Sequence, residues 1–389
     1  MDGESIAIHN LSKSLHQQGC EVTLLAMNTL RHYYAAEETP EALRHYKAVY
    51  SVDIDNRIKP HKAFLNLFSS DSYHIARFIS SDFGKMLKTL LQQEEFDVVQ
   101  LETLYLAPYI PLIRQYSRAV VAMRAHNVEH EIWERITANT EFAPKRWYLD
   151  HLTGKLRRFE KTALELYDIL VAISERDLDK FRTMGYRGAA AVIPIGIEAG
   201  AYQPDYQAFR REPAMAFIGS LDWMPNIEGL KWFLDAVWPD IRRQYPDLQL
   251  HIAGRNTPGW LQQLDMPGVT IHGEVPDAAE FINRYSMLIV PLLSGSGMRA
   301  KILEGMALGK VVLTTSLGLE GIIAHHEKEV LVADTPQAFL QTVNWCFRQN
   351  GQLESLGRNA QQFVSRHYDN HEIGRRLLKA YSNLIVEAI

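Results

Sequence analysis

Residues 287–316 read MLIVPLLSGSGMRAKILEGMALGKVVLTTS. The apolar run at residues 287–293 is long enough for a buried strand and too short for a helix. A Ser-Gly-Ser-Gly turn follows, and a helical pattern then runs over residues 298–308 and ends at Gly309, the place of a C-cap glycine. Residues 310–316 are rich in Val and Thr and predict the next strand. Because parallel strands need a crossover helix, this stretch predicts a β-loop-α-β unit of an α/β fold.

The loop and the first helical turn favour an anionic ligand. A glycine-rich loop that enters a helix exposes backbone N–H groups, and the helix dipole adds partial positive charge. Arg299 and Lys301 stand in the predicted first turn, where the dipole favours acids. Two cations there indicate that the negative charge comes from a ligand such as a phosphate or diphosphate. Glu304, one turn further on, suits a sugar diol, and a solvated Lys301–Glu304 pair is the alternative.

This stretch resembles the donor site of the family-4 (group 1) retaining glycosyltransferases, in the branch with a Gly-Ser-Gly-x-Arg-x-Lys-Ile-Leu-Glu loop. The family has the GT-B fold, so the resemblance implies two Rossmann-like domains that face a central cleft. It also implies that Glu304 belongs to the catalytic site and binds the ribose of the donor nucleotide. The first glutamate of the family motif is replaced by Ser296, so the role of that carboxylate does not carry over.

The overall composition is that of a soluble globular protein with two domains. The 389 residues exceed the size at which single cores stop growing. The net charge of −5 argues against nucleic acid as a partner. Cys20 and Cys346, far apart, are the only cysteines, which indicates a reducing, cytoplasmic compartment. No apolar run approaches a membrane span, and no secretory signal is visible.

The resemblance covers nearly the whole chain and places a hinge at Val192-Ile-Pro-Ile-Gly-Ile197. We expect residues 1–195 to form the acceptor domain and residues 196–370 the donor domain, with a helix at residues 371–389 packed back on the first domain. A Rossmann-like domain usually begins with a strand, whereas a helix from Ser5 comes first here. Either residues are missing upstream, which we favour, or the first sheet lacks its central strand.

The family's motifs imply a set of donor-binding residues. Most of them follow predicted strands of the second domain, and one lies in the remnant of an N-terminal glycine loop. The set comprises Gly3, Gly219, Ser220, Gly254, Arg255, Val275, Ser296, Gly297, Met298, Arg299, Lys301 and Glu304. Ser220 and Pro225 occupy the places of the family's usual Arg and Lys, which grip the diphosphate. We therefore expect Arg299 and Lys301 to replace that clamp.

The first domain carries a polar cluster after a strand predicted at residues 118–124. Ala125-His-Asn-Val-Glu-His-Glu131 follows at the carboxyl end of this strand, the edge where α/β sheets bind ligands. In the family, a histidine after this strand contacts the transferred sugar or the reaction centre. His126 matches it and is expected to be catalytic, and Glu129 and His130 are further candidates.

A long helix predicted at residues 145–167 carries several basic side chains. They are Lys155, Arg157, Arg158 and Lys161. One interpretation is attraction to an anionic membrane surface, as in some relatives. The other, which we favour, is a solvated basic face that Glu160 dilutes.

Together, the residues and the resemblance imply a retaining glycosyltransferase. It would move a sugar from a nucleotide diphosphate sugar to a sugar, lipid-linked or glycoconjugate acceptor, in polysaccharide or glycoconjugate synthesis. Backbone N–H groups of residues 296–298 and the two cations would stabilise the leaving diphosphate without a metal or another cofactor. The expected location is the cytoplasm, with a peripheral place at the inner face of the cell membrane left open.

Two other functions stay open. Ser296 and the missing clamp favour a non-catalytic sugar-nucleotide-binding protein. A sugar-nucleotide epimerase on the same fold would need a set of acid and base carboxylates that the sequence does not reveal. An NAD dehydrogenase is disfavoured, because no G-x-G-x-x-G follows an early strand.

Overall fold

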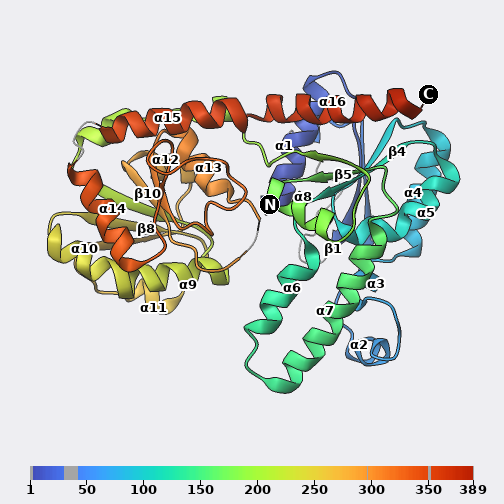
Figure 1. The fold of residues 1–389 in the computed structure, drawn as a ribbon, viewed down its shortest axis with the longest axis horizontal. Helices are drawn as coiled ribbons and strands as arrows, with labels where there is room; N and C mark the ends of the chain where they lie inside the picture. The colour runs from blue at the N-terminus through green and yellow to red at the C-terminus, as the bar shows by residue number, and fades with distance from the viewer. Residues whose placement is uncertain (1–2, 30–42, 296, 349–351, 389) are drawn as a thin grey trace. The chain divides into compact units, whose positions relative to one another are not determined.

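The computed structural model describes residues 3–29, 43–295, 297–348 and 352–388. The chain divides into two compact units (Figure 1). Unit 1 is Met1–Pro194 with Ile373–Ile389, and unit 2 is Ile195–Glu372. In both units the strands of the described residues pair only in parallel, so the predicted α/β class is confirmed. None of the described helices is both long and apolar enough to cross a membrane.

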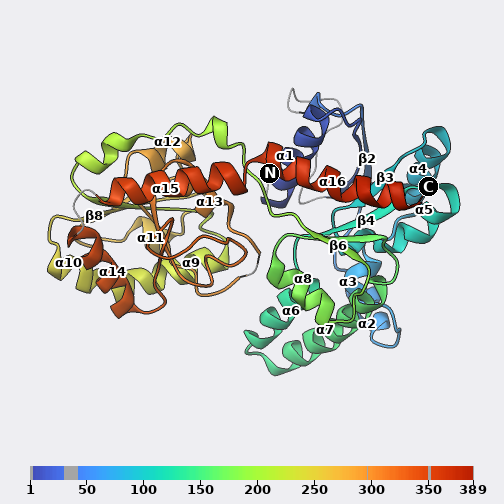
Figure 2. The ribbon, with the colours of Figure 1, turned by 45° about the horizontal axis from the view of Figure 1, so that its top comes forward.

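Unit 2 contains one six-stranded sheet with the order β12-β11-β10-β7-β8-β9. Its strands are β7 (Ala214–Ile218), β8 (Gln249–Ala253), β9 (Val269–Gly273), β10 (Met287–Val290), β11 (Val311–Thr314) and β12 (Leu331–Val332). The inner strands β10 and β11 are buried throughout, as is typical of parallel sheets covered on both faces. Figure 2 shows helices on both sides of this sheet.

The stretch at residues 287–316 forms the predicted unit. β10 leads through the glycine loop into α13 (Ala300–Ala307), and β11 then pairs with β10 in parallel. α13 buries Ile302, Leu303 and Met306 against the sheet. Gly309 follows the helix at φ +66°, a conformation that favours glycine. The prediction of a β-loop-α-β unit is therefore confirmed.

The other helices of unit 2 cover the sheet. They are η4 (Ala199–Ala201), η5 (Tyr206–Arg210), α9 (Met224–Trp232), η6 (Phe233–Val237), α10 (Trp238–Gln244), α11 (Gly259–Gln262), α12 (Ala278–Asn283), α14 (Pro336–Arg348) and α15 (Gln352–His367). The large buried side chains of this unit include Phe217, Phe233, Trp238 and Phe339, which belong to one apolar core. This core fixes the sheet whose carboxyl edge carries the candidate site.

Unit 1 contains two sheets among its described residues. β1 (Thr23–Thr29) pairs with β2 (Ala48–Ile54). A four-stranded sheet has the order β3 (Val98–Leu101), β4 (Val120–Ala125), β5 (Ile169–Ala172) and β6 (Ala189–Val192). β4 and β5 are buried throughout, whereas β1 and β3 are mostly half-buried. No ladder of hydrogen bonds joins the two sheets in the described part of this unit.

The helices of unit 1 pack around these sheets. They are α1 (Gly3–Gln17), α2 (Pro60–Asn66), α3 (Tyr73–Ala76), α4 (Ser81–Gln93), η3 (Leu104–Tyr109), α5 (Ile110–Tyr116), α6 (Glu129–Ala138), α7 (Ala143–Ala163), α8 (Glu175–Thr183) and α16 (Asn370–Ala388). α1 begins at Gly3, so the expected start at Ser5 lies inside the helix. From α16, Leu377 and Tyr381 pack in one cluster with Ile169 and Val171 of the sheet.

Candidate functional site

The carboxyl ends of β7 and β8 come very close together in unit 2. A Cβ atom on Gly254 would lie 2.1 Å from the main-chain oxygen of Gly219, so no side chain fits there. A Cβ atom on Gly219 would lie 2.9 Å from Lys301 Nζ and 2.8 Å from Asn226 Nδ2. The structure therefore brings Gly219, Gly254 and Lys301 together, and all three were predicted to bind the donor.

Lys301 stands in the first turn of α13 and reaches the end of β7. Its ammonium group donates to the main-chain oxygen of Ile218 at 3.1 Å and to Oδ1 of Asn226 at 2.7 Å. Burial, with a smaller effect of Arg299, lowers the pKa of Lys301 to about 7. Both oxygens are neutral, and the nearby carboxyl of Glu304 raises the pKa of Lys301 only in part. The Lys301 ammonium group can therefore form a charge-assisted hydrogen bond to an external anion.

Asn226 was missed by sequence reasoning. Besides accepting from Lys301, it donates from Nδ2 to the main-chain oxygen of Ser220 at 2.8 Å. It is 5% exposed, near the start of α9. An asparagine near a helix start carries no distinctive sequence signal, so only the fold reveals that Asn226 holds the lysine in place.

The loop before α13 contains two glycines in backbone conformations with positive φ, which favour glycine. Gly295 has φ +106° and Gly297 has φ +78°, while Ser296 lies outside the described residues. Arg299 is the N-cap of α13, so it precedes the first turn in which it was predicted. Its Nη1 donates to the main-chain oxygen of Gly297 at 2.6 Å, which ties the guanidinium to the loop.

Glu304 lies one turn beyond Lys301 and is partly buried. It accepts a hydrogen bond from the Tyr202 hydroxyl at 3.3 Å. Burial raises the pKa of Glu304, although the Tyr202 bond and the Lys301 charge oppose this shift. Tyr202 is a second contact that the sequence did not reveal, because 102 residues separate it from Glu304.

The remaining predicted donor residues are less closely joined. Ser220 donates from Oγ to Oδ1 of Asp222 at 2.6 Å. Arg255 is exposed, Met298 is buried, and Val275 follows β9. Gly3 starts α1 and belongs to unit 1.

A separate polar cluster lies in unit 1, at the carboxyl ends of β3 and β4. His126 directly follows β4, and Glu102 directly follows β3. His126 Nε2 and Glu102 Oε2 are 2.9 Å apart, and Arg124 Nη1 donates to the same oxygen at 3.4 Å. The pocket at this edge is lined in part by Glu102, His126, Asn127, Glu129, Glu160 and Tyr167. His126 thus lines a small cavity at the carboxyl ends of β3 and β4.

Glu102 is the main residue that sequence reasoning missed. Its carboxyl is 17% exposed and Arg124 is 1% exposed. Burial opposes the charge of Glu102, but the Arg124 guanidinium and the His126 hydrogen bond outweigh it and lower the pKa to about 2. A carboxylate only accepts, so His126 carries a proton on Nε2, and Nδ1 is the nitrogen left for other contacts.

The hydrogen bonds continue from Glu102 to the last helix. Gln100 donates from Nε2 to Glu102, and its Oε1 accepts from the Tyr381 hydroxyl at 2.5 Å. Tyr381 belongs to α16 and is 5% exposed. α16 is thereby linked to Glu102 through the side chain of Gln100.

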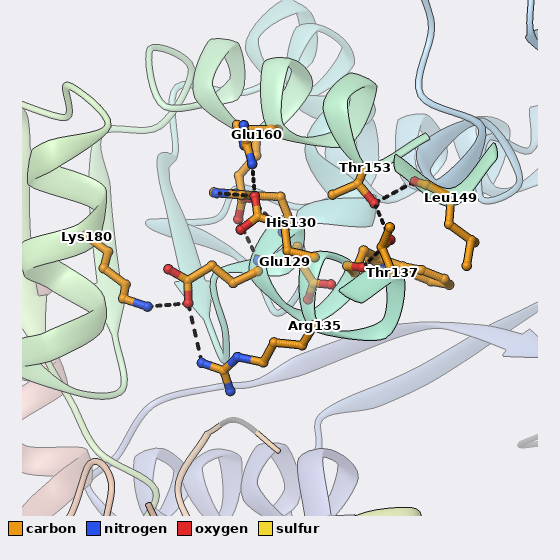
Figure 3. A network of polar contacts seen from close by, with 12 residues as sticks. Glu129, His130, Arg135, Thr137, Leu149, Thr153, Glu160 and Lys180 are labelled. Atoms are coloured by element: carbon orange, nitrogen blue, oxygen red, sulfur yellow. Dashed lines mark hydrogen bonds and ion pairs between the residues drawn. The ribbon is translucent and has the colours of Figure 1, made fainter. Parts of the chain in front are cut away.

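Glu129 and His130 have a structural partner in Glu160. Glu160 accepts from the backbone N–H groups of both residues, at 2.9 and 3.1 Å, and lies 2.6 Å from Nδ1 of His130. Figure 3 shows His130 and Glu160 turned toward each other. A carboxylate at a helix start satisfies free N–H groups, so Glu160 fixes the beginning of α6 against α7.

The basic face predicted on the long helix is only partly present. Lys155 is 2% exposed and donates to the main-chain oxygen of Asn66, so it cannot meet a membrane. Arg157 pairs with Glu134. The prediction failed at Lys155 because α2 covers this side of α7, which periodicity alone does not reveal.

Comparisons with known proteins match both units. The family model described as Glycosyltransferase Family 4 matches residues 1–200, and that described as Glycosyl transferases group 1 matches residues 212–349. An uncharacterized 44.6 kDa protein in the cps region of Klebsiella pneumoniae is 23% identical over 349 residues, with 82% of this chain and 86% of that protein covered.

Two solved structures resemble nearly the whole chain. Sucrose-phosphate synthase from Thermosynechococcus elongatus has a TM-score of 0.71 at 17% identity, covering 99% of this chain and 94% of its own. Anabaena HepE in complex with UDP has a TM-score of 0.67 at 13% identity, covering 98% and 96%. At these identities the likeness establishes the fold alone, and it confirms the predicted GT-B class.

Proposed function

The chain belongs to glycosyltransferase family 4 and is a group 1 glycosyltransferase, and from this premise we propose that it transfers a sugar from a UDP-sugar to a lipid-linked or other glycoconjugate acceptor. The uridine nucleotide is favoured because the similar HepE structure is described in complexes with UDP and with UDP-glucose. Polysaccharide synthesis is favoured because a relative is encoded in a cps region.

The proposed donor site rests mainly on one observation. Lys301 is held at the edge of the sheet by neutral oxygens, beside Gly219 and beside Gly254, where the main-chain oxygen of Gly219 leaves no room for a side chain. A diphosphate at this place would receive charge-assisted hydrogen bonds from Lys301 and Arg299 and from the backbone of the glycine loop. The same groups would stabilise the leaving diphosphate in the transition state, without a metal.

Glu304 and His126 complete the proposed chemistry. Glu304 would accept hydrogen bonds from the ribose hydroxyls, with Tyr202 holding its other side. His126, oriented by Glu102, would contact the transferred sugar with Nδ1. Retention follows from attack of the acceptor on the face that the diphosphate leaves, which needs no strong nucleophile from the protein. Unit 1 would bind the acceptor, and unit 2 would bind the donor.

A ligand screen tests the nucleotide. Thermal unfolding of the purified protein is measured with UDP-, GDP- and ADP-sugars, since a ligand that binds only the native state raises the melting temperature. We expect a clear rise with UDP-sugars and little with the others. A shift with GDP- or ADP-sugars alone would replace the uridine assignment, and no shift at all would contradict the donor site.

Product analysis then separates the alternatives. Transfer or slow hydrolysis of the donor is expected of a transferase. Binding without turnover would support the sugar-nucleotide-binding protein, and a changed sugar still attached to UDP would support the epimerase. Lys301→Met serves as the matched impaired variant, because loss of the ammonium group should weaken turnover and nucleotide binding together.

A further inference from the structure

The glycine loop of unit 2 lies along one face of α9. A Cβ atom on Gly295 would lie 3.5 Å from Cγ of Pro225, which stands in the first turn of this helix. One turn further along α9, Ser294 donates from Oγ to Oε2 of Glu228 at 2.6 Å. Two successive turns of α9 therefore contact the loop, and the second contact is made by a carboxylate.

Glu228 combines a closely packed backbone with an exposed side chain. A Cβ atom on the next residue, Gly229, would lie 2.1 Å from the main-chain oxygen of Pro291, so only glycine fits where α9 packs on the chain that leads into the loop. The side chain of Glu228 itself is exposed. A carboxylate can accept about four hydrogen bonds, and Ser294 supplies one of them. Glu228 can therefore accept further hydrogen bonds from the hydroxyl groups of a ligand.

The position of Glu228 relative to Lys301 differs from that of Glu304. Glu304 follows Lys301 by one turn in α13 and accepts a hydrogen bond from Tyr202. Glu228 comes two residues after Asn226, whose Oδ1 accepts from Lys301 at 2.7 Å, and it is bonded to the loop that precedes α13. In the proposed function, Lys301 binds the diphosphate and Glu304 binds the ribose. The transferred sugar is attached to the other end of the diphosphate, which favours Glu228 as its neighbour.

The other groups proposed to bind the donor here supply hydrogen-bond donors. Lys301 and Arg299 only donate, and the free N–H groups of the loop backbone donate as well. A sugar hydroxyl donates a hydrogen bond as well as accepting, so the bound sugar also needs an acceptor from the protein. The resembling family has a glutamate at the place of Ser296, whereas Glu228 brings a carboxylate to the same loop from α9.

We propose that Glu228 binds hydroxyl groups of the transferred sugar and that this sugar is a neutral hexose. The inference rests on the proposed function, because it requires a UDP-sugar at the glycine loop. A hexuronic acid would bring a second negative charge beside the Glu228 carboxylate, and the repulsion between the two charges disfavours its binding. Glu228 is thus a residue that determines sugar specificity.

Calorimetric titration of the full chain tests the proposal. The ligands are UDP, UDP-glucose with UDP-glucuronate, and UDP-galactose with UDP-galacturonate; each pair differs only at C6. We expect the wild type to bind one neutral UDP-hexose at least tenfold more tightly than its uronate. Glu228→Gln keeps an acceptor for Ser294 but loses the charge. It should lower the affinity for that UDP-hexose about tenfold, reduce the preference over the uronate to about twofold, and change the affinity for UDP by less than twofold.

A matched control comes from the same helical run. Asp235 is exposed in η6, seven residues and roughly 10 Å beyond Glu228, and Asp235→Asn should leave all five affinities unchanged. Equal losses for UDP and the UDP-hexose in Glu228→Gln would give Glu228 only a structural role in the loop and would overturn the proposal. Equal affinity of the wild type for hexose and uronate, or wild-type affinities in Glu228→Gln, would overturn it too. Absence of UDP binding by the wild type would instead contradict the proposed function.

Discussion

The two units differ in the hydrogen-bond partners of the buried charged groups at their candidate sites, which are charged in unit 1 and neutral in unit 2. In unit 1, Arg124 and Glu102 compensate each other and hold His126, so the charges of this network are matched within the protein. In unit 2, Lys301 is held by a main-chain oxygen and an amide oxygen, both neutral. Burial of a cation whose hydrogen-bond partners are neutral costs free energy, and burial accordingly lowers the pKa of Lys301 to about 7. The difference fits the proposal that Lys301 in unit 2 receives a charged ligand, whereas the network of unit 1 holds His126 in one orientation.

The variant Lys301→Met tests whether the ammonium group of unit 2 binds the donor diphosphate. Without the ammonium group, the leaving diphosphate loses a charge-assisted contact, and we expect kcat/KM to fall roughly 100- to 1000-fold. Steady-state transfer from the UDP-sugar measures the loss, and UDP titration calorimetry measures the affinity. Lys231→Met on an exposed position of α9 is the control. A Lys301→Met enzyme within threefold of wild type would show that the anion site lies elsewhere.

Arg299→Ala separates the second cation from the first. The guanidinium is tied to the loop through Gly297, where it can offer a planar pair of donors to a diphosphate. We expect UDP affinity to fall well over tenfold, and Arg299→Lys to restore only part of it. Arg243→Ala, at an exposed position of α10, controls for a general loss of positive charge. Unchanged affinity in Arg299→Ala would leave Lys301 as the sole clamp.

The variant Glu102→Gln tests the hydrogen-bond network of Arg124, Glu102 and His126 in unit 1. The amide oxygen can still accept from His126, but the negative charge is lost. We expect kcat to fall about tenfold while the affinity for UDP stays unchanged, because positioning of His126 serves the transition state. Glu134→Gln is the matched control, since Glu134 lies in the same unit with an exposed fraction of 37%.

A second variant separates positioning from stability. Glu102→Gln leaves Arg124 buried without its carboxylate, which also lowers the free energy of unfolding. Replacing both residues, in Glu102→Gln/Arg124→Met, should raise the melting temperature again. If kcat stays low in the double variant, Glu102 acts through His126. If kcat recovers with the melting temperature, the role of Glu102 is structural.

The pH dependence of UDP binding tests the lowered pKa of Lys301 in unit 2. A lysine with a pKa of about 7 is half protonated at pH 7 and mostly neutral at pH 8, so the affinity for UDP should fall about fivefold over this interval. Lys301→Arg stays protonated and should lack this fall. The terminal phosphate of UDP titrates equally in both proteins, so their difference reports Lys301. Identical profiles would contradict the shifted pKa.

The sequence predicted the local features of both sites and missed their partners. The β-loop-α-β unit, Gly309 and the place of His126 at a strand end follow from patterns of neighbouring residues. Glu102 and Asn226 acquire their roles only through the fold. Glu102 is 24 residues from His126 in the sequence, and Asn226 is 75 residues from Lys301, yet the fold brings each pair into contact. Periodicity shows which face of a helix is polar but not what covers it, which is why Lys155 was expected on the surface.

The variant Tyr381→Phe tests whether the functional network of unit 1 extends from Glu102 to α16. Tyr381 is 281 residues from Gln100 in the sequence, yet its hydroxyl donates to Gln100, which in turn donates to Glu102. Removing one buried hydroxyl leaves an amide oxygen without its donor, so we expect a loss of about 1 kcal/mol in the free energy of unfolding. Because Arg124 still holds Glu102, kcat should change by no more than about twofold. Urea unfolding and steady-state rates measure both quantities, with the partly buried Tyr116→Phe as the control. A fall in kcat as large as that of Glu102→Gln would instead make α16 part of the machinery that positions His126.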